Sequence, residues 1–153
     1  MNEKDLHVLL VEDDTADAEL TTRSLRKEKA AGKVVVARDG AEALDYLFCR
    51  GEFTGRDIKE IPRVVLLDLK LPRISGHDVL KAIKADERTR CIPVIVMTSS
   101  NHEEDLLECY RGGVNSYVQK PVSLSEFQEA VKQLGTYWLG INQPPPETAF
   151  QTR

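Results

Sequence analysis

The sequence has few of the features that mark a specialised class of protein. Its three cysteines, Cys49, Cys91 and Cys109, are odd in number and widely spaced. That pattern fits neither a disulfide framework nor a zinc site and favours reduced thiols. No apolar run approaches the roughly 18 residues that cross a bilayer, and the start of the chain lacks the apolar stretch of a secretion signal. We therefore expect a cytoplasmic protein that does not enter a membrane.

Charge of one sign is not concentrated anywhere in the chain. Lysine and arginine number 21 against 25 aspartates and glutamates, which gives a formal charge of −4. No basic block stands out, so the clustered positive face of a nucleic-acid-binding protein is missing. The 153 residues, 41% hydrophobic and 30% charged, are those of an ordinary globular protein of one domain.

Short apolar runs recur along the chain at fairly regular intervals. The first four are rich in Val, Ile and Leu and hardly alternate with polar residues, which is typical of strands buried on both faces of a parallel sheet. The five predicted strands are 7–11 (HVLLV), 33–37 (KVVVA), 64–67 (VVLL), 93–98 (PVIVMT) and 116–119 (SYVQ).

Segments with helical spacing lie between and after these runs. We expect the last helix over about 125–139, with Ser123 or Ser125 as its cap, and Thr15 or Asp14 as the cap of the first. The expected inward stripes are Ala18 and Leu25; Ala43, Leu44, Leu47 and Phe48; Val79, Leu80 and Ile83; Leu106, Leu107 and Tyr110; and Phe127, Val131, Leu134 and Trp138.

The alternation of strand and helix predicts an α/β fold. Its pattern is (βα)₅, a doubly wound five-stranded parallel sheet with right-handed crossovers and helices on both faces. A long polar loop is expected over 50–63. We expect residues 1–139 to form the domain and residues 140–153, which contain Pro144-Pro145-Pro146, to form a tail. No separate output domain is expected.

Acidic and hydroxyl residues follow three of the predicted strands. Glu12, Asp13 and Asp14 follow the first strand, Asp68 the third, and Thr98-Ser99-Ser100 ends the fourth; Lys120-Pro121 follows the fifth. Ligands of open parallel sheets bind at this carboxyl edge. Clustered carboxylates repel one another unless a cation such as Mg²⁺ lies between them, and Asp can accept a phosphoryl group covalently. Each residue alone also has a plain structural interpretation: a helix cap for Asp14, a surface cation for Lys120 and a strand former for Thr98.

Four motifs together resemble the signatures of response-regulator receiver domains. They are VLLVEDD (8–14), LLDLKLPRISG (66–76), VIVMTSS (94–100) and SYVQKPV (116–122), in the family's order and spacing. The resemblance covers about residues 6–138 and implies the flavodoxin-like receiver fold. It also implies a phosphoacceptor signalling protein of a two-component system, which is not an enzyme beyond its own phosphotransfer and slow autodephosphorylation.

The resemblance also assigns roles to individual residues. Asp68 matches the phosphoacceptor. Glu12, Asp13, Asp68 and the backbone carbonyl of Lys70 match the ligands of Mg²⁺, with Mn²⁺ as a substitute ion. Thr98 and Tyr117 match the switch pair, and Lys120 matches the phosphate-binding lysine. The resemblance further implies a cis peptide bond before Pro121. A core role for Tyr117 and a trans Pro121 are the structural alternatives.

A narrower resemblance concerns the single-domain, phytochrome-associated response regulators of cyanobacteria and other bacteria. The long loop, LLDLKLP, GGVNSYVQKPV and the C-terminal extension carry it. It implies a bacterial phytochrome histidine kinase as phosphoryl donor. The alternatives are a receiver for another kinase or a phosphorelay intermediate. A haloacid-dehalogenase-like phosphatase needs a second Asp where Lys70 stands, and a DNA-binding output has no room in the chain.

The end of the last helix suggests a partner surface. Trp138, Leu139 and Ile141 lie beyond the positions that the helix needs for its inward face, so we expect apolar surface to be exposed there. Exposed apolar patches commonly mark interfaces, and two-fold dimers are the commonest assembly. We expect a homodimer through the last strand, last helix and tail. The alternative is that Trp138 folds back on its own domain and the tail is disordered.

Overall fold

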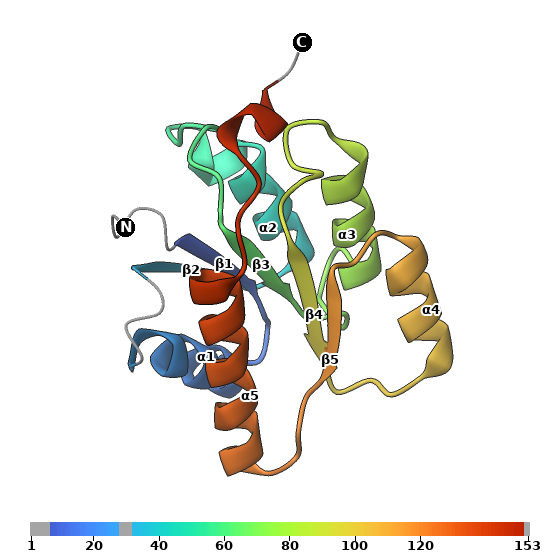
Figure 1. Ribbon diagram of the computed structural model, residues 1–153. Helices are drawn as coiled ribbons and strands as arrows, with labels where there is room; N and C mark the ends of the chain where they lie inside the picture. Colours follow the sequence, from blue (N-terminus) through green and yellow to red (C-terminus); the bar gives the residue numbers. More distant parts are fainter. Residues whose placement is uncertain (1–6, 28–31, 152–153) are drawn as a thin grey trace.

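Five parallel strands form one sheet in the computed structural model, which describes residues 7–27 and 32–151 (Figure 1). The strand order is β2-β1-β3-β4-β5. The predicted strands are confirmed, with β4 beginning one residue later than expected. Their bounds are β1 His7–Val11, β2 Lys33–Ala37, β3 Val64–Leu67, β4 Val94–Thr98 and β5 Ser116–Gln119.

Helices cover both faces of the sheet, as the (βα)₅ pattern predicts. In the described part of the chain, none is long and apolar enough to cross a membrane. Their bounds are α1 Thr15–Lys27, α2 Gly40–Leu47, α3 Gly76–Ala85, α4 Glu103–Arg111 and α5 Leu124–Thr136, with 3₁₀ turns η2 at Gly51–Phe53 and η4 at Glu147–Phe150 and a π-helical turn η3 at Tyr137–Ile141.

Side-chain caps set the starts of four helices. Asp14, Asp39, Ser75 and Ser123 each accept a hydrogen bond from the backbone N–H three residues later. Each bond satisfies an N–H that has no partner within the helix. The capping roles expected of Asp14 and Ser123 are therefore confirmed.

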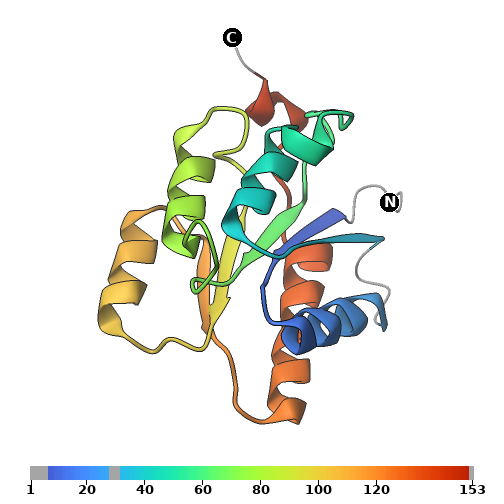
Figure 2. The same cartoon turned by 180° about the vertical axis from the view of Figure 1, so that it is seen from behind.

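Two apolar cores flank the sheet, because successive residues of a strand point to opposite faces. Alternate strand residues such as Leu9 and Leu67 pack against α2, α3 and Cys109 of α4. The intervening residues, such as Leu10 and Leu66, pack against α1 and α5 on the other face (Figure 2). Strands β1, β3 and β4 are apolar at nearly every position because both faces of the sheet are covered.

The inward side of α4 differs from the predicted stripe. Leu106, Leu107 and Tyr110 are exposed, and Cys109 is the residue of this helix that is buried. The helix lies beside α3 at the end of its layer (Figures 1 and 2), so only the side that carries Cys109 faces the core. The predicted inward face of this helix is therefore wrong, although the predicted bounds of the helix are confirmed.

The C-terminal segment returns to the domain. Regular helix ends at Thr136, and in the turn η3 that follows, Leu139 is only 3% exposed and packs in the second core with Trp138. The chain then passes to the other layer and places η4 near η2 (Figures 1 and 2), where Phe150 packs against the first core. The expectation that some apolar surface is exposed here is confirmed at Ile141, whereas Leu139 is buried.

Candidate functional site

The register of the sheet brings the first acidic strand end beside Asp68. Val11 of β1 is paired with Leu67 of β3, so the next residues, Glu12 and Asp68, leave the sheet side by side. The backbone N–H of Asp68 donates to the carbonyl of Val11 at 3.0 Å, which extends the strand pairing to the phosphoacceptor candidate itself. The carboxylates of Glu12 and Asp68 lie close together because each directly follows one of two neighbouring parallel strands.

Three carboxylates form the acidic part of the site. Glu12, Asp13 and Asp68 each offer an oxygen, and these atoms lie within 4.8 Å of one another. Glu12 and Asp68 are buried, whereas Asp13 is exposed. An all-oxygen carboxylate set of this kind suits a hard divalent cation.

The ammonium of Lys120 lies among these acids. Its Nζ donates to Glu12 Oε2 at 2.6 Å, to Asp68 Oδ2 at 2.9 Å and to Asp17 Oδ2 at 2.9 Å. Lys120 directly follows β5 and is held there because its backbone N–H donates to the carbonyl of Thr98 at 2.7 Å. One cation therefore supplies positive charge to three carboxylates from three different segments.

Asp17 was missed by the sequence analysis. It lies in the first turn of α1, three residues after its cap Asp14, and its partner Lys120 is 103 positions away in the chain. An acid in the first turn of a helix is usually explained by the helix dipole. One feature of the sequence could have identified Asp17. It lies in the first turn of the helix that follows the acidic end of β1, and this turn lies at the carboxyl edge of the sheet.

Burial shifts the protonation equilibria of the site. Burial raises the pKa of Glu12 to about 7, because the loss of solvent, reinforced by the charge of Asp68, outweighs the hydrogen bond from Lys120. Burial alone would lower the pKa of Lys120, but its hydrogen bonds to Glu12, Asp17 and Asp68 outweigh that effect and raise it. The ammonium of Lys120 therefore stays charged, and near neutral pH Glu12 is partly protonated.

The hydroxyl group expected in the site lies at the end of β4. Thr98 is fully buried, and its Oγ1 accepts a weak hydrogen bond from the N–H of Ser100 at 3.4 Å. The hydroxyl of Tyr117, on β5, donates to the carbonyl of Ser100 at 3.1 Å. Ser100 thus connects Thr98 with Tyr117. Sequence reasoning noted Ser100 as part of the motif but assigned it no role.

The loop after Asp68 is tightly packed against the acidic residue. The N–H of Lys70 donates to Asp68 Oδ1 at 3.3 Å, and the side chain of Lys70 is exposed. A Cβ on Gly76 would lie 2.3 Å from the carbonyl oxygen of Asp68 and 2.5 Å from the Cα of Leu69. Only glycine allows α3 to begin this close to the backbone of Asp68.

The peptide bond before Pro121 does not have the expected conformation. Within residues 7–27 and 32–151 the structure contains no cis peptide bond, so the Lys120–Pro121 bond is trans. The trans form of an X–Pro bond is lower in free energy by about 0.5–1 kcal/mol. With this bond trans, Lys120 still contacts all three carboxylates.

Comparison with known proteins identifies the family. The response regulator receiver domain family matches residues 8–132. Over 138 residues the chain is 45% identical to the probable methanogenesis regulatory protein FilR2 of Methanothrix harundinacea, covering 90% of this chain and 86% of that protein. It is 34% identical over 132 residues to the response regulator Rcp1 of Synechocystis sp., covering 86% and 88% of the two chains.

Solved structures agree with the sequence relatives. The crystal structure of the Mn²⁺-bound form of Rcp1 matches with a TM-score of 0.85 at 33% identity, covering 91% of this chain and 98% of that one. The phosphorylated cyanobacterial phytochrome response regulator RcpA matches with a TM-score of 0.86 at 36% identity, covering 92% and 98%. Fold, site and sequence agree: the chain belongs to the response regulator receiver domain family.

Proposed function

We propose that this receiver accepts a phosphoryl group on Asp68 from a histidine kinase, in a reaction that needs a divalent cation. The observation that carries the proposal is the position of Asp68. Its carboxylate is buried between the ammonium of Lys120, at 2.9 Å, and the acids Glu12 and Asp13. A nucleophilic carboxylate, a fixed positive charge and a set of cation ligands thus lie at one point.

The residues of the site fit a divalent cation. Glu12, Asp13 and Asp68 supply only carboxylate oxygens, and the ammonium of Lys120 contacts two of them, Glu12 and Asp68. We assign these three side chains and the backbone carbonyl of Lys70 as ligands. When bound, the cation neutralises oxygens of the transferred phosphoryl group. Mg²⁺ is the ion that such oxygen sites and phosphate ligands favour; Mn²⁺, present in the Rcp1 structure, is expected to substitute.

The transfer is a displacement at phosphorus. A carboxylate oxygen of Asp68 forms a bond to phosphorus while the bond between phosphorus and the imidazole nitrogen of the donor breaks, and that nitrogen keeps the electron pair. Lys120 is already within hydrogen-bond distance of Asp68, so its ammonium stabilises the charge on the acyl phosphate. The hydroxyl of Thr98, at the end of the neighbouring strand β4, donates a hydrogen bond to a phosphoryl oxygen.

The response to phosphorylation is expected to pass through Ser100 and Tyr117. We expect donation from the Thr98 hydroxyl to the phosphoryl group to draw Thr98 towards Asp68 and to disturb its weak contact with the N–H of Ser100. The hydroxyl of Tyr117 is held by the carbonyl of the same residue, so a movement of Ser100 releases it. The exposed face of α4 and the segment after β5 then change their conformation, and a partner binds this altered surface.

Phosphorylation of Asp68 is tested with acetyl phosphate and Mg²⁺ on phosphate-affinity gels. Wild type should shift, Asp68→Asn should not, and the control Asp78→Asn, which changes an exposed acid of α3, should shift like wild type. A shift that persists in Asp68→Asn would overturn the assignment.

The donor kinase is proposed to be a bacterial phytochrome. RcpA is a phytochrome response regulator at 36% identity, whereas FilR2, at 45%, is a probable methanogenesis regulator, which favours a different kinase. Phosphotransfer from a panel of purified histidine kinases, phytochromes included, separates the two. Transfer that is fastest from a phytochrome supports the proposal, and transfer only from other kinases contradicts it.

We also propose a homodimer, through a surface that differs from the expected one because it does not include Leu139. Leu139 is unavailable because it is buried, but Tyr110, Val122, Leu124, Tyr137 and Ile141 are exposed around β5 and α5. Exposed apolar groups on neighbouring elements favour an interface. Sedimentation equilibrium of wild type and of Ile141→Ser tests this surface without removing the packed tail. A wild-type protein that stays monomeric with and without an acyl-phosphate mimic would contradict it.

A further inference from the structure

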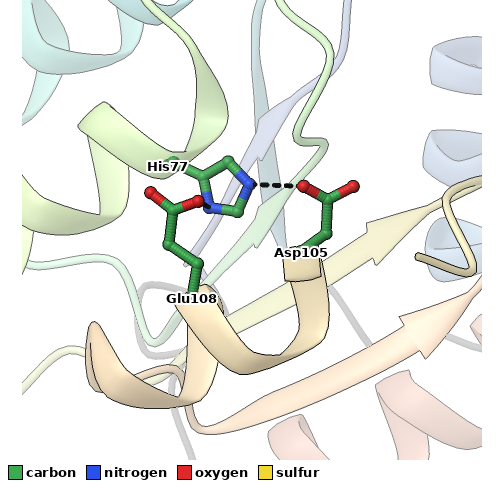
Figure 3. A group of neighbouring side chains, drawn as sticks. All are labelled: His77, Asp105 and Glu108. Carbon is green, nitrogen blue, oxygen red and sulfur yellow. Dashed lines mark hydrogen bonds and ion pairs between the residues drawn. The ribbon is translucent and has the colours of Figure 1, made fainter. Parts of the chain in front are cut away.

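A second cluster of metal-ligating side chains lies between α3 and α4, away from the phosphoacceptor site. His77, in the first turn of α3, faces Asp105 and Glu108, which are one turn apart on α4 (Figure 3). Its Nε2 is 3.0 Å from Asp105 Oδ1, and its Nδ1 is 3.6 Å from Glu108 Oε2. One ligand atom from each of the three residues lies within 4.8 Å of the other two.

We propose that His77, Asp105 and Glu108 form a site for a borderline transition-metal ion, Zn²⁺ being the expected occupant. One imidazole nitrogen and two carboxylates are a ligand set that Zn²⁺ uses, with water in the remaining position. The phosphoacceptor site offers oxygen ligands only, which suit Mg²⁺ and Mn²⁺. The two clusters therefore differ in donor type, and imidazole directs the α3–α4 cluster towards the softer ions.

The carboxylate of Asp105 is oriented by a residue outside the cluster. The hydroxyl of the buried Ser100 donates to Asp105 Oδ2 at 2.5 Å, which turns Oδ1 towards His77. Without an ion, the hydrogen bonds from Ser100 and then from His77 lower the pKa of Asp105. A second hydrogen-bonding partner that fixes a ligating carboxylate is a common feature of metal sites.

The imidazole of His77 also has a partner for the nitrogen that does not face Asp105. The Sγ of Cys109 lies 3.7 Å from Nδ1, on the same side as Glu108. If Nε2 takes the ion, the ring proton resides on Nδ1, where the Sγ of Cys109 accepts it once Glu108 has turned to the ion. The ring is only 17% exposed, so its plane is set by α3 and α4 before any ion arrives.

Access and adaptability come from Glu108 and the space beside it. The Glu108 side chain is 54% exposed, so its carboxylate can turn from Nδ1 to the ion at little cost. An open cavity of about 410 Å³ adjoins the cluster and is lined by His77, Glu104 and Glu108 among others. An ion can reach the site through this cavity and keep a water ligand there.

The plain alternative is an ion pair, in which a protonated His77 bridges the two acids. An ion pair and a metal site predict opposite responses to Zn²⁺. A bound ion would join α3 to α4 and raise the melting temperature of the folded chain by mass action, whereas an ion pair would compete with the metal for the same atoms and give no stoichiometric binding.

The full-length protein is titrated with Zn²⁺ by calorimetry, and with Co²⁺ while its visible absorption is recorded. Saturating Mg²⁺ occupies the phosphoacceptor site during these titrations, and a parallel titration of Asp13→Ala, in which that site is disabled, is the control. We expect one Zn²⁺ per chain, a rise in melting temperature, and Co²⁺ bands typical of a mixed nitrogen and oxygen site. His77→Ala should weaken Zn²⁺ binding at least about tenfold, given that loss even of outer-shell partners costs that much.

Two further variants keep the test decisive. Glu108→Gln changes a largely exposed group and so retains the fold, and it should also weaken Zn²⁺ binding. Glu104→Gln, on the same helix and lining the same cavity but outside the cluster, should bind like the parent protein. Absence of stoichiometric Zn²⁺ binding, or binding by His77→Ala and Glu108→Gln that is as tight as binding by the parent protein, would overturn the proposal.

Discussion

Replacement of Lys120 by methionine isolates the charge balance of the phosphoacceptor site. The ammonium lies 2.6 Å from Glu12 and 2.9 Å from both Asp68 and Asp17. Methionine keeps most of the apolar stem, so the main loss is the positive charge. The side chains of Glu12 and Asp68 are only 5% and 10% exposed, and the variant leaves these two carboxylates without a cation.

The expected cost follows from the burial of each partner. Removing one member of a buried ion pair costs about 3–5 kcal/mol, because the remaining charge stays desolvated. The contact with Asp17 adds little, since that side chain is 34% exposed and its charge is screened by solvent. Glu12 can also take up a proton, because its pKa is already about 7. We therefore expect a loss of roughly 3 kcal/mol in unfolding free energy in metal-free buffer at about pH 8.

The pH dependence gives a second check with a defined sign. The folded-state pKa of Glu12 is raised from 4.5 to about 7, so its contribution is fully present below pH 4.5 and is lost as the pH rises through 7. Without Lys120 this pKa rises further, since its hydrogen-bonding cation is gone. The cost of Lys120→Met should therefore be smaller at about pH 6 than at about pH 8.

Urea denaturation of wild type, Lys120→Met and Lys132→Met measures the effect. Lys132 is exposed on α5, so its variant controls for the loss of one positive charge from the whole protein. Added Mg²⁺ should restore part of the stability of Lys120→Met, because a cation bound by the carboxylates replaces the missing charge. Equal stability of Lys120→Met and Lys132→Met in metal-free buffer would refute the reasoning.

Three further substitutions test other parts of the structure. Asp13→Ala removes one of three clustered carboxylates, so the melting temperature without metal should equal or exceed that of wild type, while the rise caused by Mg²⁺ and labelling by acetyl phosphate should be lost; a large fall in melting temperature would show instead that Asp13 is structural. His7, whose pKa burial lowers from 6.5 to about 4, contributes stability that is complete above pH 6.5 and is lost as the pH falls towards 4, by about 3 kcal/mol in total. His7→Phe should flatten this part of the curve of unfolding free energy against pH, and an unchanged slope would contradict it. Gly76→Ala must displace the backbone of Asp68, so it should lose about 1–3 kcal/mol and slow phosphorylation in a timed acetyl phosphate assay. Gly140→Ala, whose Cβ would contact nothing within 4 Å, is its control, and equal behaviour of the two would argue against the steric reason.

Local pattern was sufficient for the strands and for the residues at their ends. Val64–Leu67 and Val94–Thr98 are apolar at nearly every position, a pattern that only strands covered on both faces need. Once the strands are parallel, residues that follow them share one edge of the sheet. Asp68 and Lys120 were therefore predictable as neighbours although 52 positions separate them.

Contacts between different elements were beyond the reach of local pattern. The stripe on α4 was predicted from helical spacing, but which side of the helix faces inward depends on its place beside α3, and there Cys109 is buried while Leu107 and Tyr110 are exposed. In the sequence, Asp17 has no feature that separates it from other acids in a first helical turn. Only the folded sheet brings the ammonium of Lys120 into contact with it. The trans bond before Pro121 differs by too small a free energy from the cis form for the sequence to determine it.

The C-terminal segment and the second cluster show the same division. Hydrophobicity predicted that Leu139 and Ile141 need partners, but only the folded chain buries Leu139 and brings Phe150 to the opposite core. Nothing in the sequence relates His77 to Asp105, 28 positions later. By itself, the sequence determined the strands and the residues of the carboxyl edge, because these follow from local periodicity and parallel pairing, and it indicated the family through four motifs. The tertiary structure decided which distant side chains meet, because helix rotation and chain return depend on packing across the whole domain.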